Sequence, residues 1–160
     1  MELVVAVDRN WAIGNRGELL FRIPADLQRF KALTLGHPVI LGRKTLETFP
    51  GGRPLPGRTN LILSRNPDFT AEGAAVYPDL EGLLAAAPED SFVIGGGSVY
   101  AALLPWCDTV YATRIDAAFP GADTWFPDLD ADGAWERTEE SGPLEQDGIV
   151  YRYVTYRRVP

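Results

Sequence analysis

The sequence predicts an α/β fold: a central mixed, mainly parallel β-sheet flanked by helices, with an antiparallel C-terminal edge. Short apolar runs typical of buried strands alternate with helical stretches through most of the chain, which favours parallel strands joined by right-handed crossovers. The last two expected strands, at residues 135–140 and 149–159, are joined by a Gly/Pro loop with no helix between them, so we expect them to pair antiparallel. With 160 residues, the chain is expected to form a single domain, residues 1–160, around one core.

The first elements are marked by changes in apolar patterning. Residues 3–7 are an apolar run between polar residues, typical of a buried strand. Residues 8–22 lack a regular pattern, and an irregular loop of this length in a compact domain usually has a function. A helix is expected from Pro24, whose ring suits a first helical turn, to about Leu35, because Gly36 favours its end.

The remaining elements are assigned in the same way. Residues 38–41 form a short apolar run that Gly42 ends, a short helix is expected at residues 43–49, and the turn-rich stretch 50–57 cannot be regular. We expect further strands at residues 60–64, 74–77, 92–94 and 109–115, together with helices at residues 80–87 and 98–104.

Charge and composition narrow the classes of function. The net charge is −7, which disfavours general binding to nucleic acids or anionic membranes, and no apolar stretch approaches the roughly 18 residues of a membrane span. Cys107, the single cysteine, cannot form an internal disulfide, and we expect it to be a small buried side chain. Because no signal peptide is visible and no exposed apolar stripe calls for a partner, we expect a soluble, cytoplasmic monomer.

Asp26 is the most informative single residue. It shares a face of the expected helix with Phe30 and Leu33, at i+4 and i+7, and Leu27 lies beside it, so this apolar face should point inward. An acid on an inward face costs free energy unless it is paired. Two interpretations stay open: a first-turn carboxylate that stabilises the helix dipole, or an acid kept in an apolar cleft for a cationic or donor-rich ligand.

Two glycine-led turns, at residues 39–45 and 93–100, connect a strand to a helix. Glycines there let the backbone approach a phosphate closely, and exposed N–H groups favour an anion. Neither turn is a Gly-x-Gly-x-x-Gly dinucleotide fingerprint or a Walker loop. With Ser64 and Arg65 at a further strand end, in a stretch that is basic overall, they indicate an extended phosphorylated ligand such as a dinucleotide.

Several other chemistries lack their residues. The one histidine, His37, lies beside Pro38 in a turn, no cluster has the spacing of a metal site, and no Gly-x-Ser-x-Gly elbow is present. Metal-dependent hydrolysis and acyl transfer are therefore disfavoured, and we expect no bound metal. A cofactor site beside one acid remains, and that combination fits hydride transfer, in which the cofactor carries the chemistry.

The order and spacing of several short motifs resemble those of dihydrofolate reductase across almost the whole chain. The motifs are Ala12-Ile13-Gly14, Ile23-Pro24-Ala25-Asp26-Leu27, Phe30-Lys31, Gly42-Arg43-Lys44-Thr45, Arg53-Pro54-Leu55-Pro56-Gly57-Arg58, Val93-Ile94-Gly95-Gly96-Gly97 and Tyr111-Ala112-Thr113. The resemblance implies NADPH as cofactor, 7,8-dihydrofolate as substrate, 5,6,7,8-tetrahydrofolate as product and antifolates as inhibitors. It also implies hydride transfer from nicotinamide C4 to pterin C6.

The resemblance implies a role for each matching residue on the substrate side. Asp26 binds the pterin ring, Thr113 hydrogen-bonds to that acid, and Arg58 pairs with the glutamate carboxylate of the substrate. Backbone carbonyls at Val4 and Ile94 face the pterin 4-position. The implied catalytic residues are Asp26, Thr113 and Tyr100. The implied substrate-binding residues are Val4, Val5, Asp26, Leu27, Phe30, Phe49, Arg53, Leu55, Arg58, Ile94 and Thr113.

On the cofactor side, the resemblance implies that backbone groups of Ala6 and Ile13 hold the nicotinamide carboxamide and that residues 10–22 form a loop that closes over the site. Basic residues after the strand ends are implied to meet the pyrophosphate and the 2′-phosphate. The Gly95–Gly96 peptide bond is expected to be cis. The implied cofactor-binding residues are Ala6, Ile13, Gly14, Gly42, Arg43, Lys44, Thr45, Ser64, Arg65, Gly95, Gly96, Gly97, Ser98, Val99 and Tyr100.

The chain departs from the family pattern in two places. Leu20 and Phe21 stand where the family usually has Pro-Trp, and Phe21 lacks the N–H with which that Trp holds an ordered water near the acid. The loop at residues 48–52 is also slightly long, which affects its contacts to the aminobenzoyl group of the substrate.

Two alternative functions stay open beside this resemblance. One is a reductase of the same fold that acts on a ribosylaminopyrimidine in riboflavin synthesis. Asp26 together with Arg58 argues against it, because that substrate carries no glutamate tail. The other is a catalytically silent nucleotide-binding domain.

Overall fold

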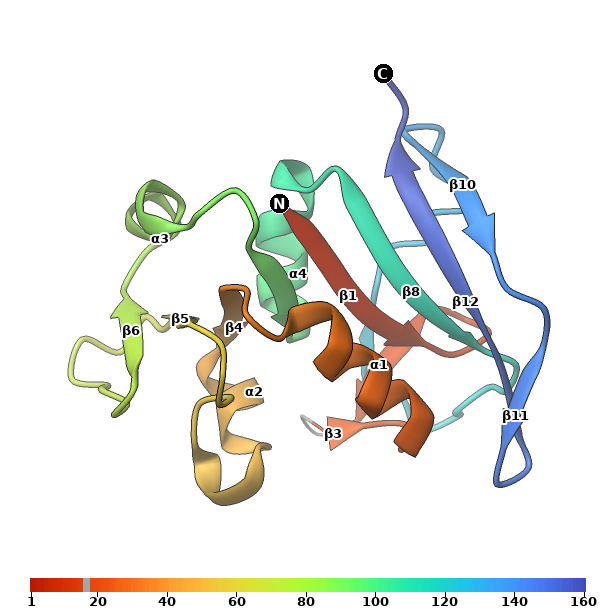
Figure 1. Cartoon of the computed structure of the whole chain (residues 1–160), viewed down its shortest axis with the longest axis horizontal. Coiled ribbons are helices and arrows are strands. Elements are labelled where there is room, and N and C mark those ends of the chain that lie inside the picture. Colours follow the sequence, from red (N-terminus) through yellow and green to blue (C-terminus); the bar gives the residue numbers. More distant parts are fainter. Residues whose placement is uncertain (16–17) are drawn as a thin grey trace.

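A computed structural model describes residues 1–15 and 18–160 and has a nine-stranded mixed sheet at its centre (Figure 1). The parallel strands lie side by side in the order β8 (Thr109–Ile115), β1 (Glu2–Val7), β7 (Phe92–Gly95), β4 (Val39–Gly42), β5 (Asn60–Leu63) and β6 (Ala74–Tyr77). The antiparallel part consists of β12 (Ile149–Arg158), which pairs with β8, and of β10 (Trp135–Glu140) and β11 (Leu144–Gln146), which pair with β12. The predicted fold class is confirmed, including its antiparallel C-terminal edge.

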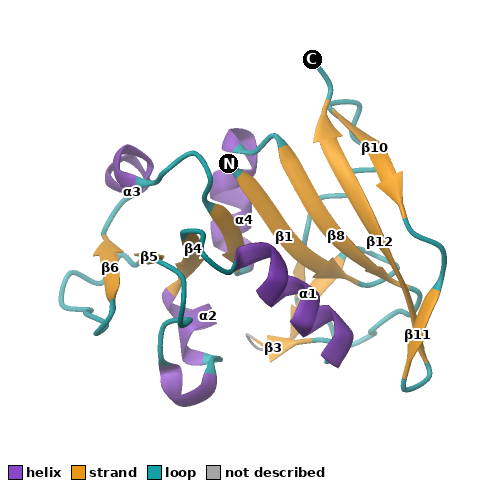
Figure 2. Ribbon diagram, in the orientation of Figure 1, coloured by secondary structure: helices purple, strands orange, loops and turns teal. Residues whose placement is uncertain are grey.

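Helices cover both faces of the sheet (Figure 2). α1 (Pro24–Thr34) lies in front of the sheet in this view, and α4 (Gly97–Leu103) lies behind it. The other helices are α2 (Arg43–Glu47), α3 (Leu80–Ala86) and the 3-10 turns η1 (Pro50–Gly52) and η2 (Leu104–Trp106). No helix in the described part of the chain is long and apolar enough to cross a membrane.

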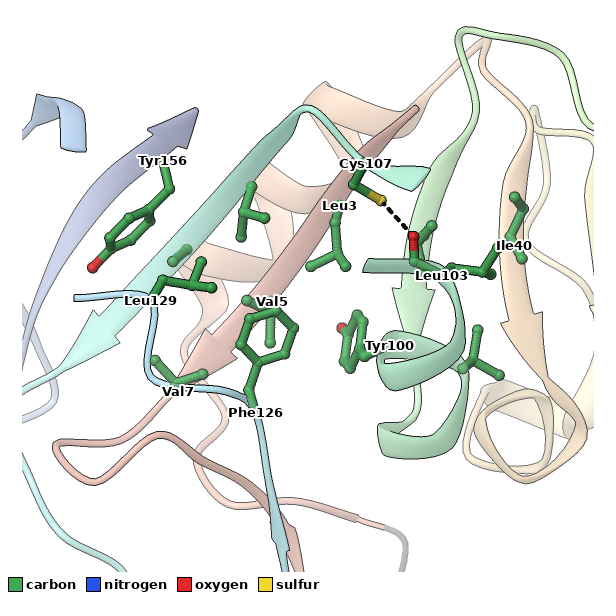
Figure 3. Close-up of a cluster of buried hydrophobic side chains, with 14 of the residues drawn as sticks. Leu3, Val5, Val7, Ile40, Tyr100, Leu103, Cys107, Phe126, Leu129 and Tyr156 are labelled. Atoms are coloured by element: carbon green, nitrogen blue, oxygen red, sulfur yellow. Dashed lines mark hydrogen bonds between the residues drawn. The ribbon is translucent and has the colours of Figure 1, made fainter. Parts of the chain in front are cut away.

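The alternation of side chains along β1 separates two layers of core. Leu3, Val5 and Val7 point to the α4 side, where they share a cluster with Tyr100 and Leu103 (Figure 3). Successive strand residues face opposite sides, so the residues between them serve the α1 side. The buried members of the cluster on that side are Val39, Leu41, Leu46, Ile62, Phe92 and Ile94.

Cys107 lies in the α4-side cluster, as Figure 3 shows. Its thiol donates to the backbone carbonyl of Leu103 at 3.4 Å. Burial raises the pKa of this thiol to about 12, so it stays protonated at neutral pH. The expectation of a small buried side chain is confirmed.

The expectation of an irregular loop at residues 8–22 is wrong in part, because strands form there. β2 (Ala12–Asn15) pairs antiparallel with β3 (Glu18–Leu19) and with β9 (Thr124–Trp125), which gives a second, three-stranded sheet within the described residues. Strands this short carry no clear apolar alternation, and β9 is distant in the sequence, so local patterning could not reveal the pairing. Residues 16–17 of this segment lie outside the described residues.

Asp8 holds the small sheet to the end of β1. Its carboxylate is buried, and Oδ1 accepts hydrogen bonds from the backbone N–H groups of Asn10 (2.8 Å) and Ala12 (2.9 Å). Oδ2 accepts from the N–H of Phe119 at 2.8 Å, although this residue is 111 positions away in the sequence. Hydrogen bonds to a charged acceptor are among the stronger ones in proteins, so one side chain fixes two loops.

Replacing Asp8 by alanine removes the acceptor from all three N–H groups. We expect Asp8→Ala to lower the free energy of unfolding by about 2–4 kcal/mol, measured by urea unfolding. Asp116→Ala is the control, because its 2.9 Å ion pair with Arg9 is exposed and such pairs contribute about 0–1 kcal/mol. Equal losses in the two variants would contradict the role given to Asp8.

Candidate active site

Asp26 lies in the first turn of α1 and points toward β8. The hydroxyl of Thr113 donates to Asp26 Oδ1 at 2.5 Å, across the interface between helix and sheet. Burial raises the pKa of the Asp26 carboxyl above its ordinary value, while the Thr113 hydrogen bond and the charge of Arg29 act in the opposite direction. Because the carboxylate is bound by the sheet, the geometry favours the second interpretation, an acid held for a ligand, over a helix-dipole role.

Tyr100 joins two neighbouring strands next to this acid. Its hydroxyl lies 2.7 Å from the carbonyl oxygen of Val4 on β1 and 3.0 Å from that of Ile94 on β7. Each carbonyl oxygen has two lone pairs, so each keeps capacity for a donor on a ligand. Burial, and to a lesser extent the charge of Asp26, raises the pKa of Tyr100, which keeps the hydroxyl neutral.

Apolar side chains from three segments border the acid's side of the sheet. Phe30, Phe49 and Leu55 are half-buried and pack against the α1-side cluster. Leu27 is 37% exposed, so the expectation that the whole apolar face of the helix points inward is wrong at this position. With 3.6 residues per turn, Leu27 is rotated by about 100° from Asp26 around the helix axis, away from β8.

Arg58 is held at the far end of α1. Its Nη1 donates to the hydroxyl of Thr34 at 3.1 Å, and its Nε donates to the carbonyl of Pro56 at 3.0 Å. Partial burial lowers the pKa of this guanidinium. A guanidinium has five N–H donors, so these two bonds fix the group and leave others for a planar anion such as a carboxylate.

Asn60 is a positioning residue that the sequence analysis missed. Its side chain is buried; Nδ2 donates to the carbonyls of Leu55 (2.9 Å) and Arg58 (3.0 Å), and Oδ1 accepts the N–H of Leu55 (3.0 Å). It therefore shapes the turn that carries both residues. A signal was present, because an Asn between a Pro-Gly turn and an apolar strand is suited to bond to nearby backbone.

The two glycine-led turns lie together, because β7 and β4 are neighbours and both end at this edge of the sheet. A Cβ atom on Gly96 would lie 3.3 Å from Thr45 Oγ1, and one on Gly97 would lie 2.5 Å from Thr124 Cγ2. A Cβ has no room at Gly97, whereas at Gly96 it would require Thr45 to shift by a few tenths of an ångström. The peptide bond between Gly95 and Gly96 is cis, as expected.

Polar residues surround these turns. Arg43 pairs with Glu47 at 3.6 Å, and Ser64 is buried after the end of β5, with its Oγ engaged by the N–H of Asn66. The exposed members of the predicted cofactor set here are Lys44, Arg65 and Ser98. Basic side chains are thus available to an anion at the ends of two adjacent strands.

Two predicted site residues, Val5 and Val99, have side chains that are packed in the fold, and a third, Arg53, is exposed. Val5 is buried in the α4-side cluster. Val99 packs over Gly42, with Cγ2 3.1 Å from the position of a Cβ there, so only its backbone is suited to meet a ligand. Arg53 is exposed directly after η1.

The segment at residues 10–22 reaches the glycine turns. The carbonyl of Gly14 accepts the N–H of Asp123 at 3.0 Å. Ile13 Cδ1 lies 3.7 Å from the position of a Cβ on Gly97, at the start of α4. β2, in the described part of this segment, is thereby anchored between the β9 region and the expected cofactor side.

A cavity of about 10 Å³ lies beside Ala6, at the end of β1, and has about the size of one water molecule. The side chain of Phe21 lines it and packs edge-on against Phe119, with ring centroids 6.2 Å apart. An aromatic contact therefore stands where the family usually has a Trp with an N–H donor. The other lining residues are Asp8, Ala12, Ile13, Leu20 and Ile115.

A larger cavity of about 290 Å³ lies on the opposite face of the sheet from Asp26. Arg114, which lines it, directly follows Thr113 on β8, so their side chains face opposite sides. Asp130 binds Arg114 at 2.7 Å and Arg137 at 2.8 Å, so much of the positive charge near this cavity is neutralised. Among the described residues, no group of three or more His, Cys, Asp or Glu could hold a metal ion.

Comparison with known families matches residues 1–158 to the family model described as dihydrofolate reductase. This chain belongs to the dihydrofolate reductase family. The match spans both sides of the site, from the acid on α1 to the glycine turns. Members of this family are oxidoreductases. Because the match is to dihydrofolate reductases themselves, it argues against the riboflavin-pathway alternative.

Relatives agree with the family match over nearly their full length. Dihydrofolate reductase type 3 of Salmonella typhimurium is 46% identical over 99% of this chain and 98% of its own. Dihydrofolate reductase of Bacillus subtilis (strain 168) is 36% identical over 99% of this chain and 94% of its own. A solved dihydrofolate reductase from Enterococcus faecalis, complexed with NADP(H) and RAB-propyl, is 38% identical and has a TM-score of 0.87 over 99% of this chain and 96% of its own.

The raised pKa of Asp26 has a consequence for stability. The folded state binds this proton more tightly than the unfolded chain, so the ionised carboxyl costs stability as pH rises above its unfolded-state pKa of 3.8. We expect Asp26→Asn to be more stable than the natural chain at pH 7, with the difference shrinking toward pH 3, in urea unfolding experiments.

The exposed position Asp68 supplies the control, since Asp68→Asn should show no such pH-dependent gain. A lower free energy of unfolding for Asp26→Asn than for the natural chain at pH 7 would contradict this expectation.

Proposed function

We propose that this chain is an NADPH-dependent reductase that converts 7,8-dihydrofolate to 5,6,7,8-tetrahydrofolate. The observation that carries the proposal is the Asp26 carboxylate, held by the Thr113 hydroxyl and raised in pKa by burial. It stands in a chain that is 46% identical, over almost its whole length, to a dihydrofolate reductase. An acid with a perturbed pKa beside glycine-rich strand ends supports this proposal, because such acids are typical of functional sites and because the cofactor carries the chemistry of hydride transfer.

We assign binding and charge stabilisation to Asp26. Its carboxylate accepts hydrogen bonds from the 2-amino group and N3 of the pterin, and its negative charge stabilises the ring protonated at N5. In this binding mode Asp26 and N5 lie on opposite sides of the ring, so water delivers the proton to N5. Thr113 orients the carboxylate, and the carbonyls of Val4 and Ile94 face the pterin 4-position.

The residues of the cofactor side fit NADPH. Gly96 and Gly97 carry no side chains, so their backbone N–H groups can approach a pyrophosphate directly. When bound, NADPH supplies a hydride from nicotinamide C4 to pterin C6. Closure of residues 10–22 over the site excludes bulk water.

The remaining substrate contacts follow the length of α1. Leu27, Phe30 and Leu55 form apolar walls for the aminobenzoyl group. Arg58, already fixed by Thr34, pairs with the glutamate carboxylate. Compounds that present the same ring donors and an apolar tail, namely antifolates, are expected to inhibit.

We also infer that residues 1–160 act as one domain and as a cytoplasmic monomer. Cys107 is a free, buried thiol, which suits a reducing compartment. The large apolar side chains that are exposed come from separate parts of the fold: Leu27, Leu35, Trp106, Trp125, Leu144 and Val159.

The proposal is tested by NADPH oxidation with dihydrofolate, in the natural chain and in Asp26→Asn. We expect Asp26→Asn to slow hydride transfer at pH 7 by roughly 10²–10⁴, the scale of a positioned proton-transfer or charge-stabilising group. The rate should partly recover at low pH, where the free substrate becomes protonated. Asp68→Asn should behave as the natural chain.

Three outcomes would contradict the proposal. Near-natural turnover by Asp26→Asn would remove the role of the acid. Oxidation of NADPH with a ribosylaminopyrimidine but not with dihydrofolate would favour the riboflavin-pathway alternative. No oxidation with either compound would favour a catalytically silent domain.

Two substrates, one with and one without the glutamate tail, test whether Arg58 binds that tail. We expect Arg58→Leu to raise KM for dihydrofolate by roughly 10–100-fold, because a hydrogen-bonded charge pair contributes about 1.5–3 kcal/mol. With a dihydropterin that lacks the glutamate tail, steady-state kinetics should show little change. Equal losses with both substrates would show that Arg58 acts on the fold of its turn instead.

Cofactor choice tests Arg43 and Arg65. NADPH differs from NADH by a 2′-phosphate, and both arginines lie at strand ends on the cofactor side. We expect a strong preference for NADPH in kcat/KM that weakens when either is replaced by Ala and that falls with added salt. Equal efficiency with NADPH and NADH in the natural chain would reject both roles.

A further inference from the structure

Arg29 lies three residues after Asp26 on α1, in a half-buried position above two tyrosines of the sheet. Its Cζ atom is 4.0 Å from the ring centroid of Tyr153 on β12 and 6.0 Å from that of Tyr111 on β8. A guanidinium over an aromatic face is attracted by the ring, and more strongly when it is partly desolvated. The two rings therefore hold the Arg29 charge at a fixed place beside the helix.

The charge of Arg29 has no carboxylate in direct contact. Within the described residues, its guanidinium is part of no ion pair shorter than 4.0 Å, unlike Arg114 and Arg137, which Asp130 neutralises. Burial lowers the pKa of Arg29, yet a guanidinium remains protonated at all physiological pH values. A full positive charge thus stands near the acid, and it acts on the Asp26 carboxyl through space and not through a direct ion pair.

The other groups that face Asp26 are uncharged in the working pH range. Thr113 on β8 donates a neutral hydrogen bond. Burial raises the pKa of Tyr153 on β12 to about 12 and also raises that of Tyr100 on α4. Among the described residues, Arg29 is therefore the charged group that acts on the Asp26 carboxyl.

We propose that Arg29 is a positioning residue that sets the pH range over which the Asp26 site holds a protonated pterin, by keeping a positive charge near the carboxylate without an ion pair of its own. This inference rests on the proposed reductase function. It concerns a residue that none of the motifs carrying the resemblance contains.

Two effects of the Arg29 charge have the same sign. The charge favours the ionised form of Asp26 before substrate binds. It also repels a pterin that is protonated at N5, because like charges in a half-buried site interact strongly. Each effect disfavours an extra proton in the site, so each lowers the apparent pKa of hydride transfer. Removing the charge should raise that pKa.

The test is the pH profile of hydride transfer, measured in single turnovers from pH 5 to 9 with NADPH bound in advance. We expect Arg29→Met to raise the apparent pKa by about 0.5–1 unit, since charges a few ångströms apart near a protein surface interact on that scale. Arg29→Lys keeps the charge and should stay near the natural profile. Lys31→Met removes an exposed charge from the same helix and serves as the matched control.

Two kinetic outcomes would overturn the inference. One is an unchanged profile in Arg29→Met. The other is an equal shift in Arg29→Met and Arg29→Lys, which would assign the effect to packing on Tyr153 instead of charge. If Arg29→Met does not fold, Arg29→Gln replaces it in the same series.

A measurement without turnover separates this inference from the proposed function. The Asp26 carboxyl is titrated by carbon-13 NMR in the ligand-free protein, with Asp26→Asn used to assign its signal. We expect a higher pKa in Arg29→Met than in the natural chain, whether or not the chain reduces dihydrofolate. An equal pKa in the two proteins would overturn the inference, whereas loss of dihydrofolate reduction alone would overturn only the proposed function.

Discussion

A carboxylate can stay half-buried in this fold because a hydroxyl from the sheet donates a hydrogen bond to it. The bond from Thr113 to Asp26 fixes α1 against β8 at a point where an unpaired acid would cost free energy. β8 lies beside β1, and β1 lies beside β7, so the same arrangement aligns the two carbonyls that Tyr100 bridges. The acid, its donor and the bridging hydroxyl therefore depend on one strand order.

The two sides of the site use different chemical groups of the chain: side chains on one side and backbone on the other. The acid side uses side chains, namely Asp26, Thr113 and Arg58, each fixed by a partner from another element or from the next turn. The glycine side uses backbone, because segments approach so closely that a Cβ would collide at Gly97 and would be tightly packed at Gly96. Side-chain chemistry can be tuned by substitution, whereas the glycine turns depend on having no side chain at all.

Local patterning was sufficient for most of the large elements, and it singled out Asp26 but left the role of that acid open until the family resemblance was considered. The strand expected at residues 109–115 has those bounds in the structure, since apolar alternation is a property of the segment itself. The pairing of β2 with β9, the bond from Phe119 to Asp8, and the buried amide of Asn60 were not predicted. Each of these contacts depends on which residues lie next to each other in the folded chain, and a single sequence does not show that. The cis peptide bond between Gly95 and Gly96 was expected from the family resemblance, because no residue propensity indicates it.

The Thr113–Asp26 hydrogen bond joins residues 87 positions apart, and Tyr153 on β12 comes later still. On the ribosome, α1 is therefore made well before the strands that will cover its inner face. Until they arrive, Asp26 and Arg29 are hydrated and behave as ordinary surface charges. In the nascent chain the Asp26 carboxyl thus has an ordinary pKa. Its pKa is raised only when the distant strands have been synthesised and the sheet has formed.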